Sequence, residues 1–195
     1  MSSFDLSNST CKEDVAVLPE VHSLWGDIVA YRRWFHANPE LSFKEFNTAA
    51  KIAEILRSFG ISEIYDGCGR TGLVAVMRGG SPGPCVALRA DIDALPVIET
   101  ADVEYKSKNA GAMHACGHDG HITGLLAAAK IINSERSSLK GCVKLLFQPA
   151  EEGYGGAKVM VADGCLEDGK FGPRVDSVYG IHLWSCKFYH GIHML

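Results

Sequence analysis

The segment His114–His121 concentrates side chains that bind metal ions. It contains three histidines, one cysteine and one aspartate within eight residues: His114, Cys116, His118, Asp119 and His121. Thiolate, imidazole and carboxylate groups are the ligands that divalent transition metals prefer in proteins. Gly117 separates Cys116 from His118 and allows a turn that directs both side chains to one point. A chance cluster in a core loop is the alternative, but this density of donors favours a metal site.

An acidic pair, Glu151-Glu152, directly follows the apolar run 142–147 and Pro149. Adjacent carboxylates in an extended chain point in opposite directions, so we expect two different roles for them. One would bind a cation, and the other would exchange a proton with water that the metal activates. A solvated acidic pair on a loop is the alternative. The glycine-rich stretch that follows, which allows close approach to a ligand, favours the functional interpretation.

Three more candidates lie near the ends of apolar runs. Asp91 and Asp93 follow the run 86–90, and His182 lies within 175–183. An Asp-x-Asp pair can orient a histidine ligand by hydrogen bonding to it without binding the metal itself. A turn with a helix cap is an equal alternative. His182 alone would be interpreted as a packed core histidine. Opposite the other donors, it becomes the natural further ligand.

The elements that must position these groups follow from hydrophobic periodicity. Apolar residues at helical spacing predict a helix from Val21 to Trp34, interrupted by Pro39, and further helices over 43–59, 119–132 and 156–162. Gly60 would end the second helix. Apolar runs predict strands over 73–77, 86–90, 142–147 and 175–183, with a turn over 79–84. This alternation predicts an α/β sheet with helical layers, in which the strands' carboxyl ends share one ligand-binding edge.

Composition excludes several classes of protein. The 195 residues are 47% hydrophobic and carry a net charge of -4, which is ordinary for a globular chain and gives no reason to expect a nucleic-acid partner. We find no apolar run of roughly 18 residues for a membrane helix and no signal peptide, so we expect no membrane partner and a cytoplasmic location. The cysteine count of seven is odd and the spacing wide, which disfavours a disulfide framework.

Four motifs in order resemble the signatures of the metal-dependent N-acyl-amino-acid amidohydrolases, which include aminoacylases, hippurate hydrolases and auxin-conjugate (indole-acetyl-amino acid) hydrolases. They are Arg33-x-x-His36-x-x-Pro39-Glu40-Leu41-Ser42-x-x-Glu45, Arg89–Pro96, Met113–His121 and Phe147–Gly153. The resemblance covers about residues 20–185 and implies an α/β catalytic domain with a zinc-aminopeptidase-like sheet. It implies a site for two divalent metal ions (Mn, Zn or Co) that hydrolyses the amide bond of a small N-acyl-amino acid.

The resemblance also implies a role for each candidate residue. Cys116, His118, Glu152 and His182 would be metal ligands. Glu151 would be the general base that takes a proton from the attacking water and passes it to the leaving amine. Asp93 would belong to the catalytic set in a supporting role, together with Asp91.

The sequence departs from the family at its C-terminal end. The family's pattern continues into a lid and dimerisation domain, further strands and a final histidine ligand, whereas this sequence ends at Leu195. We therefore expect a loose segment over 1–19, an incomplete catalytic domain over 20–185 and a divergent tail over 186–195. His190 or His193 is a weak candidate for the last ligand. The alternative function is an inactive, truncated metal-binding fragment, in which four donors close around one zinc ion.

Overall fold

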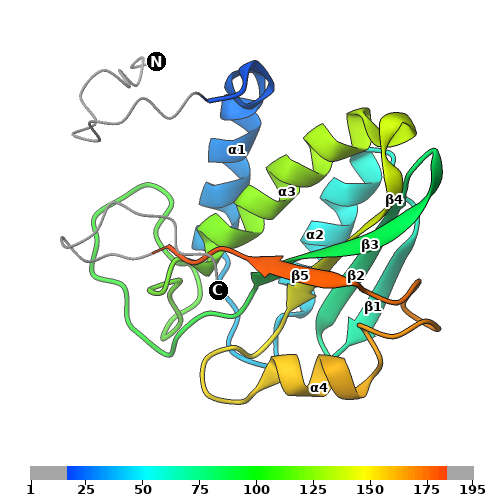
Figure 1. The fold of residues 1–195 in the computed structure, drawn as a ribbon. Helices are drawn as coiled ribbons and strands as arrows, with labels where there is room; N and C mark the ends of the chain where they lie inside the picture. The colour runs from blue at the N-terminus through cyan, green and yellow to red at the C-terminus, as the bar shows by residue number, and fades with distance from the viewer. Residues whose placement is uncertain (1–16, 184–195) are drawn as a thin grey trace.

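The computed structural model describes residues 17–183, and their centre is one five-stranded mixed sheet (Figure 1). The strands lie in the order β1-β2-β4-β3-β5. They are β1 (Ile64–Cys68), β2 (Gly72–Arg78), β3 (Ser81–Asp91), β4 (Lys140–Gln148) and β5 (Ser177–Gly180). β3 is parallel to both β4 and β5, whereas β2 is antiparallel to β1 and β4. The carboxyl ends of β3, β4 and β5 therefore meet at one edge of the sheet.

Helices cover both faces of the sheet, as the α/β prediction requires (Figure 1). Three long helices pack on one face: α1 (Pro19–Ala37), α2 (Phe46–Ser58) and α3 (His118–Ser134). The short α4 (Gly156–Ala162) packs on the other, and a 3-10 turn, η2 (Arg136–Ser138), leads from α3 towards β4. The predicted α/β architecture with helical layers is confirmed.

The strands divide their side chains between two cores, as a period of two requires. In β2, Leu73 and Met77 pack with the three long helices, and Val74 packs on the side of α4. In β4, Phe147 and Leu146 divide in the same way. Because both faces are buried, the register of these strands is fixed, and with it the positions of the residues that follow them.

Several elements differ from the sequence-based predictions. α2 begins at Phe46 rather than at residue 43, because Phe43 has a φ of 59° and stands outside the helical region. The expected turn over 79–84 is in part strand: β3 begins at Ser81, and a shift of register before Cys85 accommodates the prolines there. β5 is shorter than predicted, and β1 is a strand that the sequence pattern does not predict.

Several predictions concern residues outside the described range. His190, His193 and the tail 186–195 lie there, as does most of the expected loose segment 1–19, although α1 already begins at Pro19. The extent of the catalytic domain stays a prediction. Between residues 17 and 183, the structure has no helix of the length and apolar character that crossing a bilayer requires. The five cysteines of this range are free thiols.

Candidate metal centre

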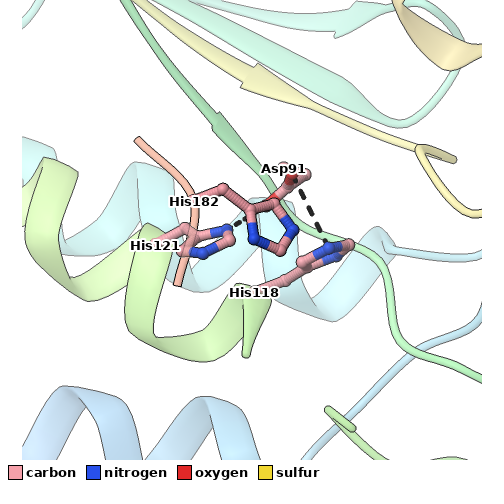
Figure 2. Close-up of side chains that lie close together, drawn as sticks. All are labelled: Asp91, His118, His121 and His182. Atoms are coloured by element: carbon pink, nitrogen blue, oxygen red, sulfur yellow. Dashed lines mark hydrogen bonds and ion pairs between the residues drawn. The ribbon is translucent and has the colours of Figure 1, made fainter. Parts of the chain in front are cut away.

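Side chains from three parallel strands and one helix converge at the carboxyl edge of the sheet. Asp91 is the last residue of β3, Glu151 and Glu152 follow β4, and His182 follows β5. The first turn of α3 adds His118, which points towards Asp91 and His182 (Figure 2). The edge that the sequence analysis singles out is therefore the place where the predicted site residues gather.

Cys116, His118 and Glu152 form a compact donor group. The Cys116 Sγ, a ring nitrogen of His118 and a carboxylate oxygen of Glu152 all lie within 4.8 Å of one another. The Nε2 atom of His182 lies 3.5 Å from the Cys116 Sγ. The four predicted ligands are thus neighbours, and a sulfur, two imidazoles and a carboxylate are a donor set that suits a transition metal. Their role as ligands stays a prediction.

The imidazole of His118 is oriented by a hydrogen bond from its Nδ1 atom. Its Nδ1 atom lies 2.8 Å from the main-chain carbonyl oxygen of Asp93, which can only accept a hydrogen bond, so Nδ1 carries the proton. The Nε2 atom faces the donor group, where it is buried without a hydrogen-bond partner among the described residues. Carboxylate oxygens of Asp91, Glu151 and Glu152 lie 3.6, 3.7 and 3.8 Å from it. Burial lowers the pKa of His118, but the hydrogen bond with Asp93 and the charge of Asp91 outweigh burial and raise the pKa. A positive charge is therefore favoured at this point, and a bound divalent cation would supply it in place of a second ring proton.

Its surroundings keep the thiol of Cys116 in the protonated form. Burial first, and then the nearby Glu152, raise the pKa of Cys116 to about 12. A thiol in this position keeps its proton at neutral pH unless a cation offsets the surrounding negative charge. Metal binding by this donor group would therefore release that proton.

Glu151 and Glu152 do not diverge as the sequence analysis expects. Ala150 has a φ of 49°, and the Gly153 N–H donates to the Glu151 carbonyl at 2.8 Å, so this stretch is a turn rather than extended chain. Both carboxylates consequently approach the same Nε2 atom of His118. The expected opposite directions are wrong, and the expected difference in role stays a prediction.

Asp93 contacts His118 and Glu152 of this donor group but is not one of its members. Its Oδ2 accepts hydrogen bonds from the Ser42 hydroxyl at 2.6 Å and from the Glu152 main-chain N–H at 3.1 Å. Its main-chain carbonyl orients His118. Burial opposes ionisation, but the hydrogen bonds with His118 and Ser42 lower the pKa of Asp93. Asp93 therefore contacts both His118 and Glu152, and its expected supporting role in the catalytic set stays a prediction.

Asp91 is occupied on both of its oxygens. Its Oδ1 lies 2.6 Å from Nδ1 of His121, and its Oδ2 lies 2.7 Å from Nη1 of Arg89. Burial raises its pKa, but the hydrogen bond from His121 and the charges of His118 and Arg89 outweigh burial and lower the pKa to about 2. Asp91 is therefore an ionised anchor at the end of β3.

The sequence analysis did not assign roles to His121 and Glu45. His121 belongs with Asp91, His118 and His182 to a second group of neighbouring donors (Figure 2). Its position three residues after His118, on the same helix face, is the signal that could have indicated it. Glu45, fully buried, accepts the Ala150 N–H at 2.9 Å and so holds the turn that carries Glu151.

Comparison with known proteins agrees with this geometry. Residues 87–192 match the model of peptidase family M20/M25/M40. The chain is 47% identical to a hippurate hydrolase from Campylobacter jejuni, covering 85% of this chain and 42% of that protein. It is also 47% identical to an N-acyl-L-amino acid amidohydrolase from Geobacillus stearothermophilus, covering 89% and 45%. The crystal structure of the Bacillus subtilis YXEP protein, described as a dinuclear metal binding peptidase from the M20 family, superimposes with a TM-score of 0.76 at 39% identity, over 83% of this chain and 44% of that one. The chain thus spans less than half the length of these relatives.

Proposed function

Because the chain belongs to peptidase family M20/M25/M40, we propose that its carboxyl-edge site hydrolyses the amide bond of N-acyl-amino acids. The observation that carries the proposal is the Nε2 atom of His118, buried and without a hydrogen-bond partner in the described range, beside Cys116 and Glu152. A structural histidine would have a hydrogen-bond partner at this atom, whereas a metal ligand would keep the atom for the ion. The carboxylate of Glu151 beside the same atom supplies the base that hydrolysis needs.

Cys116, His118, Glu152 and His182 would hold divalent ions, which we propose to be two in number, of manganese, zinc or cobalt. When bound, such ions make water more acidic and polarise the scissile carbonyl. Glu151 would accept the proton of the attacking water and donate it to the leaving amine as the C–N bond breaks. Asp93 would keep His118 and Glu152 aligned through its carbonyl and carboxylate.

The proposed substrates are small acylated amino acids. The names of the hippurate hydrolase and the N-acyl-L-amino acid amidohydrolase support this class. Hippurate, N-acetyl-amino acids and indole-acetyl-amino acids share one feature, an amide between an acyl group and an α-amino acid. They are therefore the panel of probes with which to test the proposal.

Metal binding without turnover is the second candidate function. The observation that favours it is the close approach of four donors, in which His182 Nε2 lies 3.5 Å from the Cys116 Sγ. Four protein ligands can complete the tetrahedral shell of one zinc ion and leave no open position for water. The two candidates differ in the number of ions bound and in hydrolysis.

The experiment compares the metal-loaded wild type with Glu151→Gln. We expect about two ions per chain and hydrolysis of at least one probe. Glu151→Gln should keep the ions and lower kcat by about 10²- to 10⁴-fold, as for the loss of a general base. Glu54→Gln is the matched control, because Glu54 lies on α2 with its side chain 68% exposed. One tightly held ion without turnover in the wild type would favour the second candidate, and full activity in Glu151→Gln would exclude the proposed base.

A further inference from the structure

We propose that His121 is a positioning residue that holds the segment carrying His182 at the metal centre. The ring of His121 links Asp91 to Leu183 through two hydrogen bonds, and we call this pair of bonds the link. Its Nδ1 atom lies 2.6 Å from the carboxylate of Asp91, and its Nε2 atom lies 2.8 Å from the main-chain nitrogen of Leu183. Leu183 directly follows His182. The inference rests on the proposed function only in that it takes His182 to be a metal ligand.

The two contacts define the tautomer of His121. A main-chain N–H can only donate, so Nε2 must accept from Leu183 and carries no proton. Nδ1 then carries the proton and donates it to Asp91, which Arg89 also holds in place. Both nitrogens are consequently occupied, and His121 is not a metal ligand although it lies among possible ligands. This separates it from His118, one turn earlier on α3, whose Nε2 meets no such donor among residues 17–183.

The link fixes a segment that the sheet itself does not fix. β5 ends at Gly180, so residues 181–183 lie beyond the ladder hydrogen bonds with β3. Side-chain packing places the same segment against α3: a Cβ built on Gly120 would lie 2.6 Å from the Leu183 Cδ1. Gly120 therefore leaves the space that lets Leu183 approach close enough for its N–H to reach His121. The side chain of His121 is only 2% exposed, so water does not compete for these bonds.

His182 gains its position from this arrangement. The His121 and His182 rings are neighbours, with centroids 4.7 Å apart (Figure 2). The His182 Nε2 atom lies 3.5 Å from the Cys116 Sγ. Without the link, His182 would have to be ordered when the metal binds, which weakens binding. Loss of such an outer partner typically lowers metal affinity by about 10- to 100-fold.

The first test needs no metal. The ¹⁵N and ¹H NMR signals of the His121 ring in the metal-free protein distinguish the two neutral tautomers. We expect the proton on Nδ1 and a Leu183 amide that exchanges slowly with solvent. A proton on Nε2, or a Leu183 amide that exchanges as fast as an exposed one, would overturn the inference whatever the protein hydrolyses.

The second test measures Co²⁺ binding by titration and by its visible absorption spectrum in three variants. His121→Gln places an acceptor near the position of Nε2, and should bind Co²⁺ within about threefold of wild type with an unchanged spectrum. His121→Asn keeps a donor near Nδ1 but loses the bond to Leu183, and His121→Phe loses both bonds. Both should weaken binding by about 10- to 100-fold. Ile122→Val is the matched control, because Ile122 is the next residue of α3, is fully buried and contacts the apolar core.

The outcomes separate this inference from the proposed function. Wild-type affinity in His121→Asn and His121→Phe refutes the positioning role and leaves the hydrolase proposal standing. Co²⁺ binding that depends on His121 as described, without hydrolysis of any probe, supports the positioning role and refutes the hydrolase. A weakening in Ile122→Val equal to that in His121→Phe shows general destabilisation and counts against the link. Absence of Co²⁺ binding in the wild type would refute both.

Discussion

Replacing His36 with Phe tests a buried ion-pair cluster that lies behind the metal centre. His36 of α1 places Nδ1 2.6 Å from Asp119 and Nε2 3.0 Å from Glu99. All three side chains are at most 6% exposed. Asp119 directly follows His118, so the cluster anchors the beginning of α3 to α1. Phe fills the space of the imidazole but leaves two buried carboxylates without their shared cation.

The expected loss of stability follows from this burial. Removing one partner of a buried ion pair costs about 3–5 kcal/mol, because the remaining charge stays desolvated. Arg32 remains 3.0 Å from Asp119 and is 42% exposed, so we expect the lower end, about 3 kcal/mol. For a chain of this length, that loss corresponds to a decrease in Tm of about 6–12 °C.

The effect should depend on pH in a definite direction. The hydrogen bond with Asp119 raises the pKa of His36, against the opposing effect of burial and with further help from Glu99. A histidine whose pKa is raised on folding makes its full contribution to the free energy of unfolding below its unfolded pKa of about 6.5. This contribution is lost as pH rises through the higher folded pKa. The difference between wild type and His36→Phe should therefore be largest near about pH 6 and smaller near about pH 9.

Urea unfolding followed by circular dichroism at both pH values measures this difference. His22→Phe is the matched control, since His22 lies on the same helix and is exposed. It should leave the free energy of unfolding unchanged within about 0.5 kcal/mol. A difference for His36→Phe that is absent at about pH 6, or that grows with pH, would show that His36 does not act as a cation in this cluster.

The remaining predictions concern the supports of the site and of the sheet. Glu45→Ala leaves the Thr71 hydroxyl and the Ala150 N–H without their acceptor, and should lower the free energy of unfolding by about 3 kcal/mol in urea titrations. Because burial raises the pKa of Glu45, the wild type should lose stability relative to Glu45→Gln as pH rises above about 4.5, and the opposite trend would refute this. Gly141→Ala should cost about 3 kcal/mol or more, because φ is 87° and the Cβ would collide with the Pro84 carbonyl. Gly26→Ala, in an open helical position, should instead stabilise by about 0.5–1 kcal/mol, and equal Tm shifts in the two glycine variants would contradict the reasoning.

The elements that sequence reasoning located best are those with local signals. The helix predicted over 156–162 has the bounds of α4, because Gly155 in the left-handed region starts it. The apolar runs of β2 and β4 are equally clear, since both faces of these strands are buried. β1 shows no such signal: two of its five residues are exposed, and it is a strand because Ile64 and its neighbours pair with β2. Pairing with a distant partner is not visible in a local pattern.

The same contrast between local and distant signals applies to the candidate site. Sequence reasoning identified which segments would meet, since the ends of parallel strands share an edge. It could not predict the direction of Glu151, which depends on a turn held by Glu45, 105 residues before Ala150. Nor could it predict that Leu183 donates to His121, because that bond joins residues 62 positions apart.

The contrast between His118 and His121 shows what distinguishes a predicted ligand from its support. Both rings lie on one face of α3, and both donate from Nδ1 to an oxygen atom at the end of β3 or just beyond it. Residue type, helix and the Nδ1 donor are therefore the same. The difference lies at Nε2, where a main-chain N–H meets His121 and no donor in the described range meets His118. In this cluster of histidines, the site that fits a metal ion is the one where the surrounding fold supplies no proton.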